Sequence, residues 1–437
     1  MTQALRLGIA GLGTVGAGVL DILARHKELV AARAGRPVEV VAVSARSRGK
    51  DRGHDLSKLA WHDDPVKLAA DPSVDVFVEL MGGEGDPAKA AVETAIRSAK
   101  HVITANKALL AHHGSALARL AEEKGVALNF EASVAGGIPI IKTIREGLAG
   151  NRVGKLFGIM NGTCNYILTK MGNEGRSFTE VLKEAQALGY AEADPTFDVE
   201  GVDAAHKATI MSAIAFGIPM QFDKAYIEGI SKLDSVDITY AEQLGYRIKL
   251  LGIARRRENG VELRVHPTLI PAKRLIANVE GAMNAVLVQG DAVGATLYYG
   301  KGAGAEPTAS AVIADLVDVT RLHTSDPEHR VPHLAFQPDQ VRNVPVLPIE
   351  DVVTSYYLRM RVEDKPGVLA DITRILADSD ISIEALNQKE AAEGESHTDI
   401  ILLTHQTVER KANAAIARIE ALPVVHGKVT KLRMESL

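Results

Sequence analysis

The chain has 437 residues, of which 46% are apolar and 24% are charged, and its formal net charge is −5 at pH 7. One hydrophobic core rarely serves so long a chain, so two or three domains are expected. No apolar run approaches the roughly 18 residues that span a bilayer, and no basic run indicates a nucleic-acid surface. The first residues lack the pattern of a secretory signal, and the single cysteine, Cys164, excludes an internal disulfide. These properties predict a cytoplasmic protein whose partners are small molecules, with no membrane and no nucleic acid among them.

The first 140 residues alternate between strand and helix patterns. Strands are predicted at 5–10, 38–43, 74–80, 101–104 and 126–130, and helices at 14–30, 88–98 and 115–124. Such alternation predicts an α/β fold in which helices cover a doubly wound parallel sheet of the Rossmann type. We assign residues 1–140 to this domain and expect a helix at about 305–322 to pack back on it.

A glycine-rich loop lies between the first strand and the first helix. It has the form G-x-G-x-x-G and supplies the candidate cofactor contacts Gly11, Gly13, Thr14, Val15 and Gly16. The first glycine turns the chain, the second admits a pyrophosphate and the third allows close helix packing. This context predicts a dinucleotide site; a tight turn without a ligand is the alternative.

The second strand indicates which dinucleotide is preferred. An acidic residue at its end would favour NAD, because a carboxylate binds the ribose 2′-hydroxyl. Here the strand runs into Ser44-Ala45-Arg46-Ser47-Arg48. Arg46 suits a 2′-phosphate, so NADP is preferred over NAD, with a solvated basic loop as the alternative.

The rest of the chain divides into three parts. Residues 141–323 mix strands at 155–160, 261–269 and 285–289 with a helix at 203–216, which predicts an α+β domain. Five prolines fall between 327 and 348, so 324–350 is expected to be an extended linker. Residues 351–437 follow a βαββαβ pattern, with strands near 357, 381–386, 399–403 and 427–432 and helices ending near 377 and 421. This order predicts a ferredoxin-like domain.

An acidic segment at 189–207 ends in the helix of the middle domain. Asp203 lies in its first turn, where a carboxylate complements the helix dipole, and Lys207 lies on the same face four residues later. Apolar residues follow at +3, +4 and +7, so Lys207 borders the buried stripe. Burial lowers the pKa of a lysine and a neighbouring aspartate raises it, so the sequence leaves the net direction open. A surface ion pair worth about 0.3 to 0.5 kcal/mol is the alternative.

Several blocks together resemble monofunctional homoserine dehydrogenases that carry a C-terminal ACT domain. With the glycine-rich loop they span about residues 8–320 in the family's order: Thr104-Ala105-Asn106-Lys107, Glu131 to Pro139, Asn161-Gly162-Thr163-Cys164-Asn165-Tyr166, Ala185 to Lys207, and Gly300-Lys301-Gly302-Ala303-Gly304. The joint match is more specific than any one motif. Cys164 departs from the family's N-G-T-T-N-Y run, a change expected to alter packing more than chemistry.

The resemblance implies a reaction and a site. It implies NAD(P)H-dependent reduction of L-aspartate 4-semialdehyde to L-homoserine in threonine, methionine and isoleucine biosynthesis, with 141–323 serving substrate binding and dimerisation. Lys207 would donate the proton and Lys107 and Asp203 would complete the catalytic set, Lys107 also lying beside the cofactor. The implied substrate contacts are Glu192, Asp198, Gly162, Thr163 and Tyr190, and a further cofactor contact is Gly302. A monovalent cation, sodium, would be held largely by backbone carbonyls, at Glu131, Val134, Gly136 and Ile138.

The last domain contains a second resemblance. The turn Asp364-Lys365-Pro366-Gly367-Val368-Leu369 is similar to that of ACT domains, which bind amino acids at paired interfaces. It implies regulation by threonine in a homodimer or homotetramer, with Asp364, Gly367 and Ser382 at the effector site. A purely structural dimerisation module is the alternative. A linker before this domain predicts that truncation after about residue 350 leaves an active enzyme.

Two other functions are alternatives for this sequence. One is a dehydrogenase of a related amino-acid aldehyde or alcohol, against which the order of the matched blocks argues. The other is a catalytically silent amino-acid sensor, which would not need the proton donor that Glu192, Asp203 and Lys207 together imply.

Overall fold

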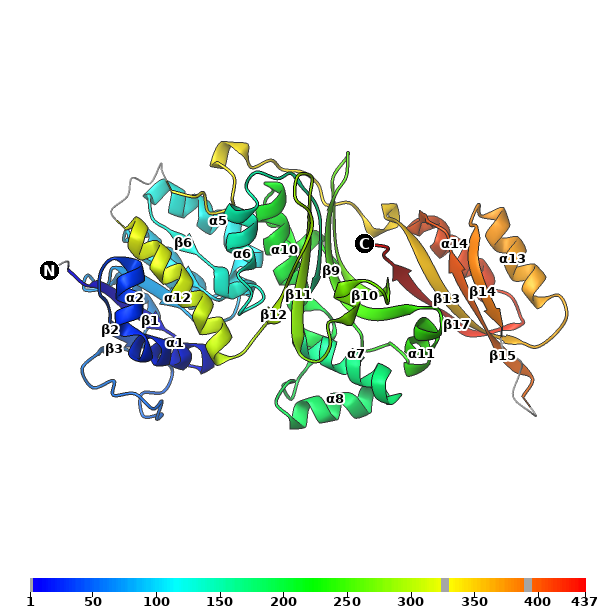
Figure 1. The fold of residues 1–437 in the computed structure, drawn as a ribbon, viewed down its shortest axis with the longest axis horizontal. Coiled ribbons are helices and arrows are strands. Elements are labelled where there is room, and N and C mark those ends of the chain that lie inside the picture. The colour runs from blue at the N-terminus through cyan, green and yellow to red at the C-terminus, as the bar shows by residue number, and fades with distance from the viewer. Residues whose placement is uncertain (1–2, 324–329, 389–394) are drawn as a thin grey trace.

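The computed structural model describes residues 3–323, 330–388 and 395–437, which form three packed units (Figure 1). The first unit is a six-stranded parallel sheet in the order β3-β2-β1-β4-β5-β6. Its strands are β1 Leu5–Ala10, β2 Val38–Ser44, β3 Ala60–His62, β4 Val76–Glu79, β5 His101–Thr104 and β6 Leu128–Asn129. The strand order reverses between β1 and β4, as in dinucleotide-binding sheets. The predicted Rossmann fold is confirmed.

Helices cover both faces of this sheet. They are α1 Thr14–Arg25, α2 Lys27–Ala34, α3 Pro65–Ala70, α4 Ala88–Arg97, α5 Lys107–Lys124 and, from far along the chain, α12 Ala305–Leu322. Figure 1 shows α12 beside α1. A Cβ on Gly18 would lie 2.9 Å from the Ala305 carbonyl oxygen. The close approach of α1 to the start of α12 therefore depends on glycine at this position.

Two of the predicted helices differ from the observed ones. The helix predicted at 14–30 is two helices, because His26 leaves the helical conformation with φ −119° and separates α1 from α2. The helix predicted at 115–124 begins at Lys107. Its N-cap is Asn106, whose side-chain oxygen accepts a hydrogen bond from the backbone N–H of Leu109 at 3.0 Å. This earlier start places Lys107 on the first turn of α5.

The second unit is built on long antiparallel strands with helices on one face. The strands are β7 Val153–Ile159, β9 Tyr246–Arg256, β10 Val261–Pro271, β11 Met283–Gly290 and β12 Gly294–Lys301. The helices are α7 Gly162–Glu174, α8 Phe178–Ala187, α10 Val202–Phe216 and α11 Ser235–Gln243. Short elements complete it: α6 Ile140–Lys142, α9 Thr196–Val199 and β8 Tyr226–Ile227. This is the predicted α+β unit, and no helix in the described ranges is long and apolar enough to cross a bilayer.

The third unit confirms the predicted βαββαβ fold. Its elements are β13 Val353–Glu363, α13 Val368–Asp378, β14 Ile383–Gln388, β15 His397–Thr404, the short β16 Thr407–Val408, α14 Glu409–Glu420 and β17 Val425–Met434. The strand order is β17-β13-β15-β14. β17 also pairs with β10 in parallel, through Thr268 with Arg433 and Leu269 with Met434. The sheets of the second and third units are therefore one continuous sheet.

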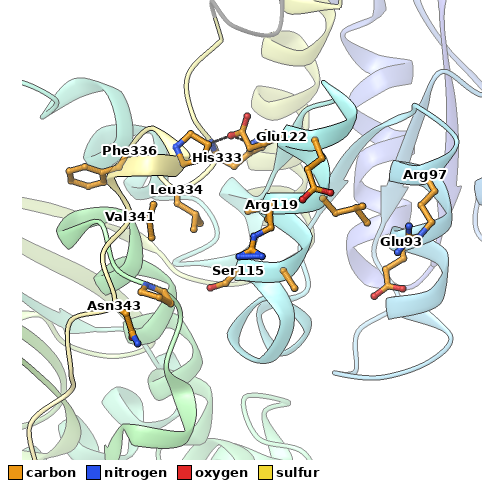
Figure 2. Close-up of a pocket in the computed structure, with 16 residues that line it drawn as sticks. Glu93, Arg97, Ser115, Arg119, Glu122, His333, Leu334, Phe336, Val341 and Asn343 are labelled. Atoms are coloured by element: carbon orange, nitrogen blue, oxygen red, sulfur yellow. Dashed lines mark hydrogen bonds and ion pairs between the residues drawn. The ribbon is translucent and has the colours of Figure 1, made fainter.

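The proline-rich segment lies along the body of the protein. Its residues 324–329 lie outside the described ranges, and the rest is held by specific contacts. His333 Nδ1 lies 2.5 Å from Glu122 Oε1 on α5, as Figure 2 shows. Further on, Leu347 N donates to the Val261 carbonyl oxygen at 2.8 Å and Val261 N donates to that of Pro345 at 2.9 Å. The described part of the segment is irregular, with a short 3-10 helix at Pro338–Gln340, and it is bound to the catalytic body at several points.

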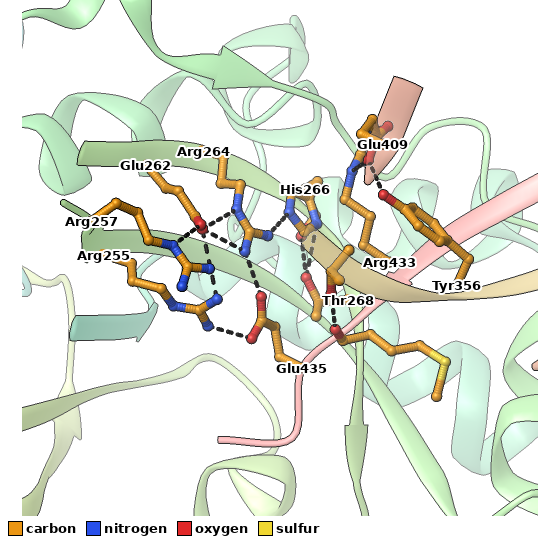
Figure 3. Close-up of polar contacts among 12 residues, drawn as sticks. Arg255, Arg257, Glu262, Arg264, His266, Thr268, Tyr356, Glu409, Arg433 and Glu435 are labelled. Carbon is orange, nitrogen blue, oxygen red and sulfur yellow. Dashed lines mark hydrogen bonds and ion pairs between the residues drawn. The ribbon is translucent and has the colours of Figure 1, made fainter. Parts of the chain in front are cut away.

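A buried polar network joins the third unit to the second (Figure 3). Arg433 on β17 is only 2% exposed, and its Nη2 lies 2.7 Å from Glu409 Oε1 on α14. Its Nη1 lies 2.7 Å from Glu228 Oε2 in the second unit. Glu435 accepts from Arg264 Nη2 and Arg255 Nη2, each at 2.5 Å. Removing one partner of such a network leaves buried charge unpaired. The expectation that truncation after residue 350 spares activity is therefore not supported, because it would strip partners from Glu228, Arg255 and Arg264.

We expect Arg433→Met to lower the free energy of unfolding by about 3 kcal/mol, because Glu409 loses its bidentate partner while remaining buried. Urea titration of the full chain at pH 7 measures this. Arg361→Met is the matched control, because it removes a half-exposed strand arginine that pairs with exposed Glu395 and, at 3.5 Å, with Asp399, and a loss of less than about 1 kcal/mol is expected. Equal losses in the two variants would contradict a special role of Arg433.

Candidate active site

The glycine-rich loop at the end of β1 forms a cradle beside α1. Gly11 has φ +100°, and a Cβ there would lie 2.4 Å from the Leu80 carbonyl oxygen. A Cβ on Gly16 would lie 2.2 Å from the Gly11 carbonyl oxygen, whereas Gly13 faces open space. Because α1 begins at Thr14, its free N–H groups are directed at this opening. The loop therefore fits a pyrophosphate.

The basic loop after β2 closes one side of this cradle. Arg46 is exposed, and a second arginine organises the loop: Arg52 Nη2 donates to the Ser47 carbonyl oxygen at 2.6 Å and Arg52 Nε donates to that of Leu12 at 3.3 Å. Arg52 thus connects the basic loop to the glycine-rich loop. Sequence reasoning missed it, since no local pattern marks an arginine that binds carbonyls 5 and 40 residues away.

The centre of the site is a carboxylate between two ammonium groups. Asp203 Oδ2 lies 2.8 Å from Lys207 Nζ, and Asp203 Oδ1 lies 3.0 Å from Lys107 Nζ. Lys207 Nζ also donates to the Met160 carbonyl oxygen at 2.6 Å. Lys207 is 8% exposed and Asp203 4%. The alternative of a surface ion pair is therefore wrong, and α5 of the first unit meets α10 of the second at this carboxylate.

The three charges set one another's pKa values. Burial lowers the pKa of Lys207, and although Asp203 opposes this, the net shift is downward. The pKa of Lys107 is raised, because attraction to Asp203 outweighs burial. Burial alone would raise the pKa of Asp203, yet the two lysines hold it well below its usual range. Asp203 therefore stays charged, and of the two lysines Lys207 releases its proton more readily.

Asn161 links this centre to the acidic segment. Its Nδ2 donates to Asp203 Oδ2 at 2.9 Å and to Asp198 Oδ1 at 2.7 Å, while its Oδ1 accepts from the backbone N–H of Cys164 and caps α7. Burial, together with the nearby Asp203, raises the pKa of Asp198. Asn161 begins one of the family-like runs, but the sequence predicted no role for its side chain. Its position before a helix could have indicated the cap, but not the bridge between two carboxylates.

The other expected substrate contacts form the exposed rim. Thr163 Oγ1 donates to the Tyr190 carbonyl oxygen at 2.6 Å, which fastens the acidic loop to α7. Tyr190 is largely exposed, and so is Glu192, whose charge contributes to the raised pKa of Lys107. A Cβ on Gly162 would lie 2.7 Å from the Ala282 carbonyl oxygen, so that position requires glycine. Lys107, Asp198, Asp203 and Lys207 are brought together, with Glu192 and Tyr190 at the entrance.

A group of aromatic rings that the sequence did not reveal lies beside Lys107. Lys107 Nζ lies 5.5 Å from the ring centroid of Phe197, and the ring of His206 lies 5.5 Å from Phe197 and 4.3 Å from Phe222. Burial, with a smaller effect of His112, lowers the pKa of His206 to about 4. The imidazole is therefore neutral at pH 7 and adds no third positive charge beside the lysines.

The segment expected to hold a cation lies where the first two units meet. Glu131 accepts from the backbone N–H groups of Ile141 at 2.9 Å and Lys142 at 2.7 Å. The carbonyl oxygens of Val134 and Gly136 accept no hydrogen bond from the described residues, whereas that of Ile138 accepts from Ile140 N at 2.7 Å. These groups are all oxygen donors, and two carbonyls are free, so the set fits a hard, weakly held ion.

Gly302, the other expected cofactor contact, packs closely against this segment. A Cβ on Gly136, whose φ is +42°, would lie 2.6 Å from the Gly302 carbonyl oxygen, and a Cβ on Gly302 would lie 1.9 Å from Asn284 Nδ2. Gly137 N also donates to the Lys301 carbonyl oxygen at 2.9 Å. The chain therefore returns from β12 to α12 through a turn that is tightly fitted to the candidate cation segment.

The expected effector residues do not form one cluster within the chain. Asp364 is exposed, and Gly367, with φ +94° and open space around it, precedes α13. Ser382 follows the other end of this 11-residue helix, about 16 Å away at 1.5 Å per residue. Within one chain a helix therefore separates Ser382 from Asp364 and Gly367, and their grouping at a paired interface stays a prediction.

Comparison with known proteins agrees with this geometry. The family model for the NAD binding domain of homoserine dehydrogenase matches residues 11–131, the model for homoserine dehydrogenase matches 139–317 and the ACT domain model matches 356–424. The chain belongs to the homoserine dehydrogenase family. It is an oxidoreductase with an NAD-binding domain and an ACT domain, as the sequence predicts.

Relatives of this homoserine dehydrogenase match nearly its whole length. The homoserine dehydrogenase of Pseudomonas aeruginosa is 58% identical over 99% of both chains. A crystal structure of a homoserine dehydrogenase from Thiobacillus denitrificans is 62% identical, with a TM-score of 0.94 over 99% of both chains. A hyperthermophilic archaeal homoserine dehydrogenase in complex with NADPH is 25% identical, with a TM-score of 0.63, and matches 73% of this chain and 98% of its own.

We expect Asn161→Asp to destabilise this dehydrogenase in a pH-dependent way. The variant keeps the cap oxygen but places a third carboxylate beside Asp198 and Asp203, so the pKa of the new group rises above its unfolded value of about 3.9. The loss relative to the natural chain is then small near pH 4 and grows with pH, reaching about 2 to 3 kcal/mol at pH 8. Urea titrations at pH 5 and 8 measure it. Asn343→Asp, at an exposed amide, is the control, and a loss independent of pH would contradict the bridging role of Asn161.

Proposed function

We propose that this enzyme catalyses NAD(P)H-dependent reduction of L-aspartate 4-semialdehyde to L-homoserine, within threonine, methionine and isoleucine biosynthesis. The observation that carries the proposal is the buried set of Lys107, Asp203 and Lys207, which adjoins a cradle suited to a pyrophosphate. The substrate is an amino-acid zwitterion with an aldehyde, so its site needs carboxylates for the ammonium and cations for the carboxylate and the developing alkoxide. Glu192 and Asp198 supply the first, and the two lysines supply the second.

In this proposal Lys207 is the general acid. A bound nicotinamide cofactor supplies the hydride to the aldehyde carbon. Lys207 Nζ gives a proton to the aldehyde oxygen as negative charge develops there, and Asp203 stabilises the ammonium form beforehand. Lys107 would lie between cofactor and substrate. In the oxidation direction Lys207 must first be neutral, so homoserine oxidation rises with pH through the pKa of Lys207, which burial places below its usual value.

NADP is the preferred cofactor in this proposal, with NAD as second choice. The exposed Arg46 and the loop that Arg52 organises support a contact with the 2′-phosphate. Thr14, Val15 and the loop glycines would bind the pyrophosphate, and Gly302 would border the cofactor. The archaeal relative in complex with NADPH agrees with this preference.

A monovalent cation, sodium, completes the proposed site. Glu131, Val134, Gly136 and Ile138 would hold it, the carbonyls of Val134 and Gly136 being the strongest candidates because they are otherwise unpaired among the described residues. The ion would join the segment after β6 to the turn at Gly302.

Lys207→Ala tests the assignment of the general acid. We expect kcat to fall by about two to four orders of magnitude, with KM changed much less, because the proton donor acts in the transition state. Aspartate semialdehyde reduction is followed with NADPH and, separately, with NADH. Lys183→Ala, at an exposed lysine on α8, should leave kcat unchanged. A fall of less than tenfold in Lys207→Ala would remove Lys207 from the role, and no turnover by the natural chain would favour a silent sensor.

The ACT domain is proposed to bind threonine and inhibit the enzyme in a homodimer or homotetramer. The turn at Asp364 and Gly367 is exposed, and α13 starts directly after it, so its free N–H groups suit an amino-acid carboxylate. The proposed location of the enzyme is the cytoplasm. Its proposed domain limits are 1–140, 141–323, 324–350 and 351–437. A dimerisation module without an effector is the second candidate.

Gly367→Asp tests this regulation without removing β17. The substitution places a carboxylate in open space at the candidate effector site, and aspartate tolerates a positive φ better than most residues. We expect turnover without threonine to stay within about twofold and the threonine concentration for half inhibition to rise about tenfold or more. Gly35→Asp, at an open position of similar φ in the first unit, is the control. Unchanged inhibition would place the effector elsewhere, and a natural chain indifferent to threonine would favour the dimerisation module.

A further inference from the structure

A pocket of about 470 Å³ lies at the far end of α10 from the catalytic centre. Its wall comes from the residues before β7, the end of α10, the end of β9 and the proline-rich segment. Phe216, the last residue of α10, lines it and is nine residues from Lys207, or about 13 Å along the helix. The pocket is therefore separate from the proposed active site.

Three arginines line this pocket, one from each of three segments. They are Arg152 before β7, Arg256 at the end of β9 and Arg342 in the proline-rich segment. The described residues that form the wall include no aspartate and no glutamate, and none of the three guanidinium groups forms an ion pair within the described parts of the chain. Asp291 accepts a hydrogen bond from the backbone N of Arg152 at 2.8 Å, but it does not line the pocket.

Arg256 distinguishes this pocket from an ordinary solvated patch. Its Nη2 donates to the Phe216 carbonyl oxygen at 2.8 Å, and its guanidinium lies 5.1 Å from the centroid of the Phe216 ring. Its Nε is buried and has no hydrogen-bond partner among the described residues. Burial, and then the neighbouring Arg152, lower the pKa of Arg256. A buried donor without an acceptor is rare in folded proteins, and here it lies beside an unbalanced positive charge.

We propose that this pocket binds a small oxyanion, the phosphate or carboxylate group of a metabolite, through Arg152, Arg256 and Arg342. Guanidinium groups bind such anions by paired hydrogen bonds, and a ligand would separate the positive charges of Arg152 and Arg256. The pocket volume lies within the range of small-molecule sites. Because Arg256 already covers the Phe216 carbonyl, the negative end of the α10 dipole is partly offset.

Occupancy would fasten the proline-rich segment to the catalytic body. Arg342 N donates to the Gly217 carbonyl oxygen at 2.9 Å, so the segment already passes the C-terminus of α10. An anion held by Arg342 on one side and Arg152 and Arg256 on the other adds a second connection at the same point. The inference goes beyond the proposed reaction and does not depend on it.

Calorimetric titration of the full chain, saturated with NADP so that phosphate cannot enter the cofactor cradle, tests this site. Inorganic phosphate and citrate are the two probes, at constant ionic strength set with sodium chloride. We expect at least one to bind with a Kd below about 10 mM, and Arg342→Gln to weaken that binding about tenfold or more. Arg97→Gln, at an exposed arginine of the pocket in Figure 2, should leave it unchanged.

The outcomes separate the sources of the anion. Binding of phosphate alone identifies a phosphoryl ligand, binding of citrate alone identifies a carboxylate ligand, and binding of both supports a general oxyanion site. Arg256→Gln is a second variant that removes the buried donor. Absence of saturable binding for both probes, or binding that both arginine variants retain at full strength, would overturn the proposal.

Discussion

The buried carboxylate of Asp203 is the interaction on which the rest of the site depends. A buried charge is costly unless it is paired, and Asp203 is paired twice, with a lysine from its own helix and with one from α5 of the nucleotide-binding unit. The two helices must therefore approach each other at their N-termini. This pairing fixes the first unit, with its glycine-rich cradle, relative to the short helix α9 that carries Asp198, so the geometry of the site follows from electrostatic pairing.

Asn161 and the aromatic rings extend this arrangement in different ways. The amide of Asn161 holds two carboxylates at a separation that they would not keep unaided, because it donates one hydrogen bond to each. Phe197, whose ring lies against Lys107, and the neighbouring neutral ring of His206 add apolar surface without adding charge. The lysines therefore lie in a setting where their electrostatic effect on a substrate is stronger than in water.

Features that depend on residues close together in the sequence could be predicted from the sequence. The glycine-rich loop and the strand–helix alternation predicted the Rossmann unit, and the spacing of four residues predicted that Asp203 and Lys207 share a helix face. The pairing of Lys107 with Asp203 joins residues 96 apart, and the family resemblance put both in one site without predicting that they touch. The break at His26 was missed, because apolar spacing does not fix where a helix bends. The proline content predicted an extended linker at 324–350, but it could not predict that the described part of this segment binds the catalytic body.

The parallel pairing of β10 with β17 has a consequence for synthesis of the chain. Leu269 and Met434 pair across the two units, so the ribosome makes β17 on the order of ten seconds or more after β10 at typical elongation rates. During that interval the outer edge of β10 lacks its later neighbour, and an open strand edge can recruit other chains. Part of this edge is already covered, because β8 pairs with Arg264 and Val265, so the segment that waits for β17 is the short stretch around Thr268 and Leu269. A short open edge offers little template for pairing with another chain, so the early arrival of β8 limits the exposure of the nascent sheet.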